Sequence, residues 1–152
     1  MDRRAFVASM LGAVAANAAA DRIRIGFLGA SHSHAWEKSV VVRGSPRWEL
    51  AGVCEADAEI RARFEKADVR ILSERELLED PTIRVVAVES GVPQHAGHGQ
   101  LALEAGKHLH LEKPPADNLK DLNSLLATAE KKNLLVQMGY MWRYHPGINR
   151  AL

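Results

Sequence analysis

The run IRIGFLGASHSH, residues 23–34, indicates a buried strand that leads through a turn into a helix. Its first six residues are nearly all apolar, and Gly29 follows where a tight turn needs a residue without a side chain. A helix is expected over residues 34–43, because Gly44 and Pro46 follow as stop signals. This stretch therefore predicts a strand–turn–helix unit.

Five further apolar runs alternate with helical patterns along the rest of the chain. Strands are expected at 48–54, 69–72, 85–88, 108–111 and 134–138, and helices at 57–66, 73–81, 95–105 and 119–133. Short apolar strands separated by helices pair in parallel through right-handed crossovers, and continuously apolar strands are covered on both faces. The sequence therefore predicts an α/β fold, a doubly wound parallel Rossmann sheet of order 3-2-1-4-5-6.

Length, charge and cysteine content exclude several classes of protein. The chain has 152 residues and a formal net charge of +1 at pH 7. Its lysines and arginines are scattered along the chain, so nothing points to nucleic acid as a partner. Cys54 is the only cysteine, which excludes an internal disulfide.

The first 20 residues differ in composition from the rest. Arg3 and Arg4 precede an apolar, alanine-rich run, and residues 16–20 offer small-x-small cleavage sites. This layout predicts a signal peptide that is too short for a stable membrane span, and the arginine pair favours the twin-arginine route. An exported, periplasmic or extracytoplasmic protein is expected. The alternative is an uncleaved helix on a cytoplasmic protein.

The remaining sequence divides at about residue 140. Residues 21–140 are expected to form the Rossmann domain. Residues 141–152 look like the start of another element, with Pro146 near a helix start. We interpret them as the start of a connection to a C-terminal substrate domain.

A sheet of this kind binds ligands outside the carboxyl ends of its strands. The first loop runs from Gly29 into a helix N-terminus, where backbone N–H groups favour a pyrophosphate. Of the fingerprint G-x-G-x-x-G only Gly29 is present, with Ser31 and His34 at the other two glycine positions. An ordinary strand-to-helix turn is the alternative.

Glu55 follows the second predicted strand, 26 residues after Gly29. An acid at about this spacing accepts hydrogen bonds from the adenosine ribose. Its carboxylate would repel a 2′-phosphate, which favours NAD over NADP, although Arg61 and Arg63 could still accommodate NADP. A solvated loop carboxylate is the alternative interpretation.

Four histidines are expected near this rim of the sheet: His32, His34, His95 and His98. Their spacing is not that of a metal-binding pair, and no carboxylate or cysteine joins them at a ligand-like interval, so no metal is expected. Contact with substrate or cofactor, or simple solvent exposure, is expected instead. His95 is the best functional candidate, because its helix begins where the strand order reverses.

The segment Glu112-Lys113-Pro114-Pro115 follows the fifth predicted strand. A lysine at the carboxyl end of a strand can polarise a carbonyl or hold a hydroxyl during hydride transfer. The prolines fix its backbone, and one of them can be cis. A rigid turn with an exposed lysine is the alternative.

Several segments resemble the Gfo/Idh/MocA family, which includes glucose–fructose oxidoreductase and inositol dehydrogenase. The run AGKHLHLEKP, residues 105–114, resembles the family's A-G-K-H-V-x-x-E-K-P, and His95 stands where the family carries a histidine eleven residues before that glycine. LLEDPTI (77–83) and RYHP (143–146) resemble its L-L-x-D-P-x-I and R-F-x-P segments. The resemblance covers about residues 22–150.

The resemblance implies a cofactor-binding half of an NAD(P)-dependent enzyme. The loop after the first strand would contact the pyrophosphate, Glu55 the ribose, and the segment after the fifth strand the nicotinamide. The predicted cofactor residues are Gly29, Ser31, His32, Glu55, Glu112 and Lys113. The predicted catalytic residues are Lys113, Glu112 and His95. The chain departs from the family in its glycine-poor loop and at Gly91, where the family commonly has proline. The family's principal proton-transfer residues would follow the end of this sequence.

The predicted function is hydride transfer between NAD, or NADP, and a sugar, polyol or related small molecule. An exported enzyme meets little free cofactor, so it would keep the dinucleotide bound and regenerate it on a second substrate. The alternatives are a glycoside hydrolase that retains NAD and a catalytically silent nucleotide-binding fragment. A homo-oligomer is expected for a full-length form.

Overall fold

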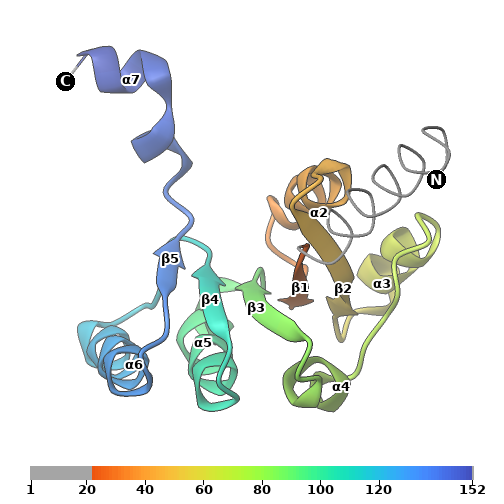
Figure 1. Ribbon diagram of the computed structural model, residues 1–152, viewed down its shortest axis with the longest axis horizontal. Coiled ribbons are helices and arrows are strands. Elements are labelled where there is room, and N and C mark those ends of the chain that lie inside the picture. Colours follow the sequence, from red (N-terminus) through yellow and green to blue (C-terminus); the bar gives the residue numbers. More distant parts are fainter. Residues whose placement is uncertain (1–21, 152) are drawn as a thin grey trace, which may run out of the picture.

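The structure is a computed structural model that describes residues 22–151, and the predicted signal peptide lies outside these residues. Five parallel strands form one sheet in the order β2-β1-β3-β4-β5 (Figure 1). The strands are β1 (Ile23–Leu28), β2 (Trp48–Cys54), β3 (Ile83–Val88), β4 (His108–Leu111) and β5 (Val136–Met138). The order reverses between β1 and β3, so their carboxyl ends form the expected ligand-binding edge.

Helices cover both faces of this sheet (Figure 1). On one face lie α4 (Glu74–Glu79), α5 (His95–Glu104) and α6 (Leu119–Lys132), and on the other lie α2 (Ala35–Gly44) and α3 (Ala58–Glu65). The side chains of a strand alternate between the faces, so Val86 and Val88 enter one core while Ala87 enters the other. The structure thus confirms the doubly wound architecture.

The strand expected at residues 69–72 does not form. Only Ile71 makes a bridge there, in parallel with Val53. Asp68 turns the chain with a φ of 58° just before this stretch, and Ser73 already caps α4 just after it. Too few residues remain to extend a ladder at the edge of the sheet. The other five predicted strands keep their predicted order.

Side chains cap the first turns of two helices. The Asp57 carboxylate accepts hydrogen bonds from the N–H groups of Glu59 and Ile60, at 2.8 and 3.0 Å, at the start of α3. Ser73 and Glu76 form the reciprocal capping box at the start of α4. Each cap satisfies N–H groups that a first helical turn leaves without partners.

Two short 3-10 helices, η1 (Val92–Gln94) and η2 (Met141–Tyr144), and the helix α7 (Pro146–Ala151) complete the described elements. Figure 1 shows η2 and α7 extending away from the sheet beyond β5. Among the described residues, no helix combines the length and the apolar character that crossing a membrane requires. The predicted domain boundary near residue 140 stays a prediction.

Candidate functional site

The first turn brings the end of β1 close to the end of β3. Gly29 has a φ of 75°, and a Cβ at this position would lie 2.5 Å from the Cβ of Ser90. Both the backbone conformation and the space therefore require glycine. The single glycine that remains of the fingerprint is the one that this turn needs.

The Glu55 carboxylate holds the same turn from the end of β2. It accepts a hydrogen bond from the Ala30 N–H at 2.6 Å and another from the Asp57 N–H at 2.9 Å. Two backbone donors fix the orientation of this carboxylate. Glu55 thus lies at the ligand-binding edge with its charge held in place.

A cavity of about 320 Å³ lies between this turn and the ends of β2 and β3. Gly29, Ser31 and Glu55 line it together, as does His98 from α5. In the part of the chain that the structure describes, the N–H groups of Ser31 and Ser33 donate no hydrogen bond. These free amides lie in the turn that leads into α2, with Ser31 in the cavity wall, and they fit a phosphate. The carboxylate fits a ribose hydroxyl. The residues present therefore fit the adenosine and pyrophosphate of a dinucleotide.

The two residues after β4 differ in exposure. Glu112 is fully buried, and its Oε1 lies 3.3 Å from Nδ1 of His34. Lys113 is exposed and precedes a cis peptide bond to Pro114. Lys113 is therefore accessible to a ligand. Glu112 can act on a ligand only through the side chains that it contacts.

A largely buried charged cluster, made of Lys38, Glu89, His110 and Glu112, lies behind this edge. Both carboxyl groups are fully buried, and the side chains of Lys38 and His110 are 24% and 20% exposed. The ammonium of Lys38 donates to Glu89 Oε1 at 2.6 Å and to Glu112, and lies 2.9 Å from His110 Nε2. Burial raises the pKa of Glu89 to about 7 despite the opposing charge of Lys38. Burial also acts to raise the pKa of Glu112, but hydrogen bonds from Lys38 and the Lys113 N–H outweigh it and hold that pKa at about 2.

Three members of this cluster were not among the predicted site residues: Lys38, Glu89 and His110. Lys38 lies one helical turn after His34, so the two side chains share a face of α2. Glu89 continues the alternation of β3, and His110 and Glu112 share one face of β4. Polar residues at inward positions near strand ends were the signal that could have revealed them.

His95 is fully buried, with both ring nitrogens next to backbone oxygens. Its Nδ1 lies 2.7 Å from the oxygen of Pro114, and its Nε2 lies 2.9 Å from the oxygen of Ser90. The ring therefore connects the loop after β4 to the loop after β3. This geometry is that of a positioning residue, and direct participation of His95 in catalysis stays a prediction.

The fold brings Glu112 next to histidines, which spacing along the sequence did not indicate. His32, His34 and Glu112 offer ligand atoms within 4.8 Å of one another, as do Glu89, His110 and Glu112. In the second group the Lys38 ammonium already lies against all three ligand atoms. The prediction that no metal binds stays a prediction.

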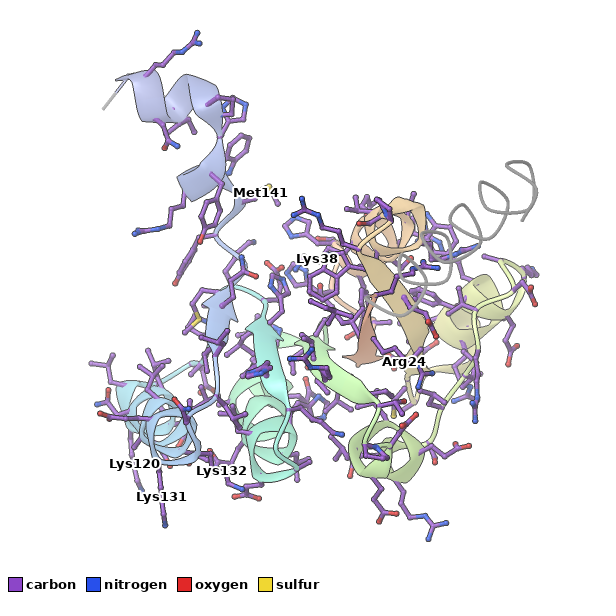
Figure 2. The ribbon with its side chains drawn as sticks, viewed as in Figure 1. Arg24, Lys38, Lys120, Lys131, Lys132 and Met141 are labelled. Atoms are coloured by element: carbon purple, nitrogen blue, oxygen red, sulfur yellow. The ribbon has the colours of Figure 1, made fainter. Side chains whose placement is uncertain are left out.

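A second cavity, of about 630 Å³, lies on the sheet face beside α2. Its lining is mainly apolar, with Phe27 and Val85 from the strands and Val41 from α2. Lys38 from α2 and Met141 from η2, both labelled in Figure 2, also line it. The largely buried charged cluster thus lies between this apolar space and the ligand-binding edge.

Comparison with known proteins places the fold in a family. The sequence profile of an oxidoreductase family with an NAD-binding Rossmann fold, Gfo/Idh/MocA, matches residues 23–140. A dTDP-3,4-didehydro-2,6-dideoxy-α-D-glucose 3-reductase of Saccharopolyspora spinosa is 34% identical over 128 residues, which cover 81% of this chain and 38% of that protein. Inositol 2-dehydrogenase 3 of Saccharopolyspora erythraea is 32% identical over 132 residues, covering 82% and 38%. The chain therefore spans less than half the length of these relatives.

Solved structures agree with this assignment. A 3-ketoreductase from Actinomadura kijaniata, in complex with NADP and TDP-benzene, aligns with a TM-score of 0.77 and 25% identity over 86% of this chain and 41% of that one. Biliverdin reductase from Synechocystis, in complex with biliverdin and NADP+, aligns with a TM-score of 0.71 and 29% identity over 76% and 37%. The family match takes in most of the described residues, so the chain belongs to the Gfo/Idh/MocA oxidoreductase family and carries its NAD-binding Rossmann domain.

Proposed function

We propose that the protein is an NAD(P)-dependent oxidoreductase that transfers hydride between a bound dinucleotide and a hydroxyl or keto carbon of a sugar, polyol or related molecule. One observation carries the proposal: a single cavity is lined by Gly29, by the fixed Glu55 carboxylate and by Ser31, whose N–H group is free. The names of two relatives, a dTDP-sugar reductase and an inositol dehydrogenase, support the substrate class.

The bound dinucleotide would supply the hydride acceptor or donor. The amides of Ser31 and Ser33 would hold the pyrophosphate and Glu55 the adenosine ribose. Lys113 would donate a hydrogen bond to the substrate oxygen, whose negative charge grows in the transition state. Glu112 and His95 would hold the strand-end loops around this lysine.

Of the two dinucleotides, we propose NAD as the preferred one. The Glu55 carboxylate would repel the 2′-phosphate of NADP. Both arginines that could counter this repulsion already have partners. Arg61 donates to the backbone oxygen of Glu55 at 3.1 Å, and the Arg63 guanidinium lies 4.2 Å from the centre of the Trp36 ring. Neither guanidinium is therefore free to bind a phosphate without giving up a contact.

Calorimetric titration with NAD+ and NADH tests the proposed cofactor site. Ser31→Asp adds a negative charge at an exposed position beside the free amides, so we expect it to weaken dinucleotide binding by more than about tenfold. Ser124→Asp, at an exposed position of α6, is the matched control and should bind as the wild type does. Equal binding by both variants would place the dinucleotide elsewhere, and a wild type that binds neither form would refute the function.

We also propose that residues 1–20 direct export. The support is the sequence alone: an arginine pair, an apolar run and small residues at the expected cleavage point. An exported oxidoreductase would keep its dinucleotide through many turnovers. Such a protein would have to fold and bind its dinucleotide before export.

A further inference from the structure

Glu89 is a fully buried carboxyl group to which dinucleotide binding assigns no role. Its Oε1 accepts a hydrogen bond from Lys38 at 2.6 Å, whereas its Oε2 has no hydrogen-bond partner among the described residues. A buried carboxylate oxygen without a donor is costly, and protonation removes that cost by removing the charge. The geometry therefore favours Glu89 as a group that holds a proton.

The second carboxyl group on the same ammonium belongs to Glu112. One ammonium cannot neutralise two buried carboxylates, so one member of the pair is expected to gain and lose a proton near neutral pH. The other titratable groups that face the pair are His32, His34 and His110. Burial and the charge of Lys38 lower the pKa of His110, so it adds no positive charge at neutral pH.

The two carboxyl groups differ in their hydrogen bonds. Glu112 receives a hydrogen bond from Lys38 and one from the Lys113 N–H, and its other oxygen lies beside His34. The carboxyl group of Glu89 receives one hydrogen bond, from Lys38. The directions of the two pKa shifts agree, since the pKa of Glu89 is raised to about 7 and that of Glu112 lowered to about 2. Glu89 is thus the member that binds the proton.

Short contacts connect Glu89 to the ligand-binding edge. Glu89 and Glu112 both accept from Lys38, and Glu112 lies 3.3 Å from His34. The His34 side chain is 30% exposed at the start of α2. His34 and Lys38 both line the 630 Å³ cavity beside α2. A proton can therefore move between that cavity, at the start of α2, and Glu89, although Glu89 itself has no exposed surface.

We propose that Glu89 is the proton store of the dinucleotide site. When an alcohol is oxidised, its carbon-bound hydrogen would leave as hydride to the bound oxidised dinucleotide. Its hydroxyl proton would pass through His34 to Glu112, while the Lys38 ammonium gives one of its own protons to the Glu89 carboxylate and takes up the proton from Glu112. The products are a carbonyl compound, a reduced dinucleotide and a protonated Glu89, so atoms and charge balance. Carbonyl reduction runs the same transfer in reverse. This inference rests on the proposed function, which supplies the hydride acceptor.

The titration of Glu89 can be measured without any ligand. Carbon-13 NMR can follow the glutamate carboxyl groups of the 152-residue chain from pH 5 to 9. One resonance should change its chemical shift with a midpoint near pH 7. That resonance should disappear in Glu89→Gln and remain in Glu65→Gln, which removes an exposed carboxylate of α3. In Lys38→Met the midpoint should rise by at least about one unit, because the ammonium is lost. A Glu89 resonance that does not move over this range would overturn the inference.

The link to the dinucleotide has its own measurement. Reduction removes the positive charge of the nicotinamide ring, so Glu89 should hold its proton more firmly with NADH than with NAD+. Calorimetry at pH 7 in two buffers of different ionisation enthalpy should show that NADH binding takes up more protons than NAD+ binding, by about half a proton. Glu89→Gln should remove this difference, and Glu65→Gln should keep it.

The outcomes separate the two proposals. A difference in proton uptake that persists in Glu89→Gln would overturn the proton store while leaving the proposed function intact. Absence of binding by either dinucleotide would overturn the proposed function, and the store with it, even if Glu89 titrates near pH 7. Both expected results together would support the store.

Discussion

Glu55 is the residue that bears on the choice between the two dinucleotides. Its carboxylate is held by the Ala30 and Asp57 N–H groups, so the negative charge cannot turn away from a ligand in the cavity without losing two hydrogen bonds. Its position after β2 was readable from the sequence, because spacing along one strand–helix–strand unit determines it. Gly29 was readable for the same reason. Each residue directly follows its own strand, Gly29 after β1 and Glu55 after β2.

Glu55→Gln is expected to relax the discrimination against NADP. The amide keeps an oxygen acceptor for the Ala30 N–H but carries no charge, so the ratio of the NADP and NAD affinities should rise about tenfold or more. Parallel calorimetric titrations with both dinucleotides measure the ratio. Glu59→Gln, at an exposed position of α3, is the control. An unchanged ratio in Glu55→Gln would mean that another residue excludes the phosphate.

Glu89→Gln is expected to change how stability depends on pH. The pKa of Glu89 in the folded chain is raised from an ordinary value of 4.5 to about 7. Its contribution to stability is therefore fully present below pH 4.5 and is lost as the pH rises through 7. The free energy of unfolding of the variant should therefore rise, relative to that of the wild type, by up to about 3 kcal/mol between pH 5 and pH 8.

Urea unfolding at the two pH values measures this change. Glu65→Gln should follow the wild type at both. A Glu89→Gln variant whose stability runs parallel to that of the wild type would show that Glu89 is already ionised at pH 5.

At the scale of helices and strands, local signals predicted most of the architecture. The helices expected at residues 57–66 and 73–81 form as α3 and α4, and each begins directly after a capping residue, Asp57 or Ser73. The strand expected at residues 69–72 failed, because an edge strand depends on partners that its own residues do not specify. The largely buried charged cluster was missed for a related reason. Lys38, Glu89 and His110 are far apart in the sequence and meet only through strand order and helix placement.

Ser73→Ala removes the capping box of α4 and should destabilise the fold by about 1 kcal/mol. The loss follows because the Glu76 N–H and the Ser73 N–H each lose or weaken a hydrogen bond. Denaturant unfolding measures it against Ser124→Ala, a substitution at an exposed position of α6. Equal stability of the two variants would show that water replaces the cap without cost.

For the whole molecule, we propose that the protein is exported and keeps its dinucleotide bound after export. Replacing Arg3 and Arg4 by lysines should stop export if the twin-arginine route is used, because that route reads the arginine pair. Cell fractionation and the N-terminal mass of the protein from each fraction report the result. Replacing Arg43 and Arg47 in the same way is the control, since both lie outside the predicted signal. Normal export of the Arg3 and Arg4 variant would exclude the twin-arginine route.

Native mass spectrometry of the purified chain shows whether this domain binds a dinucleotide. With NAD+ added, we expect a complex heavier by the mass of one dinucleotide, formed by the wild type and by Ser124→Asp but not by Ser31→Asp. A chain that stays free of ligand with both NAD+ and NADP+, while its mass and unfolding transition show that it is intact and folded, would refute dinucleotide binding.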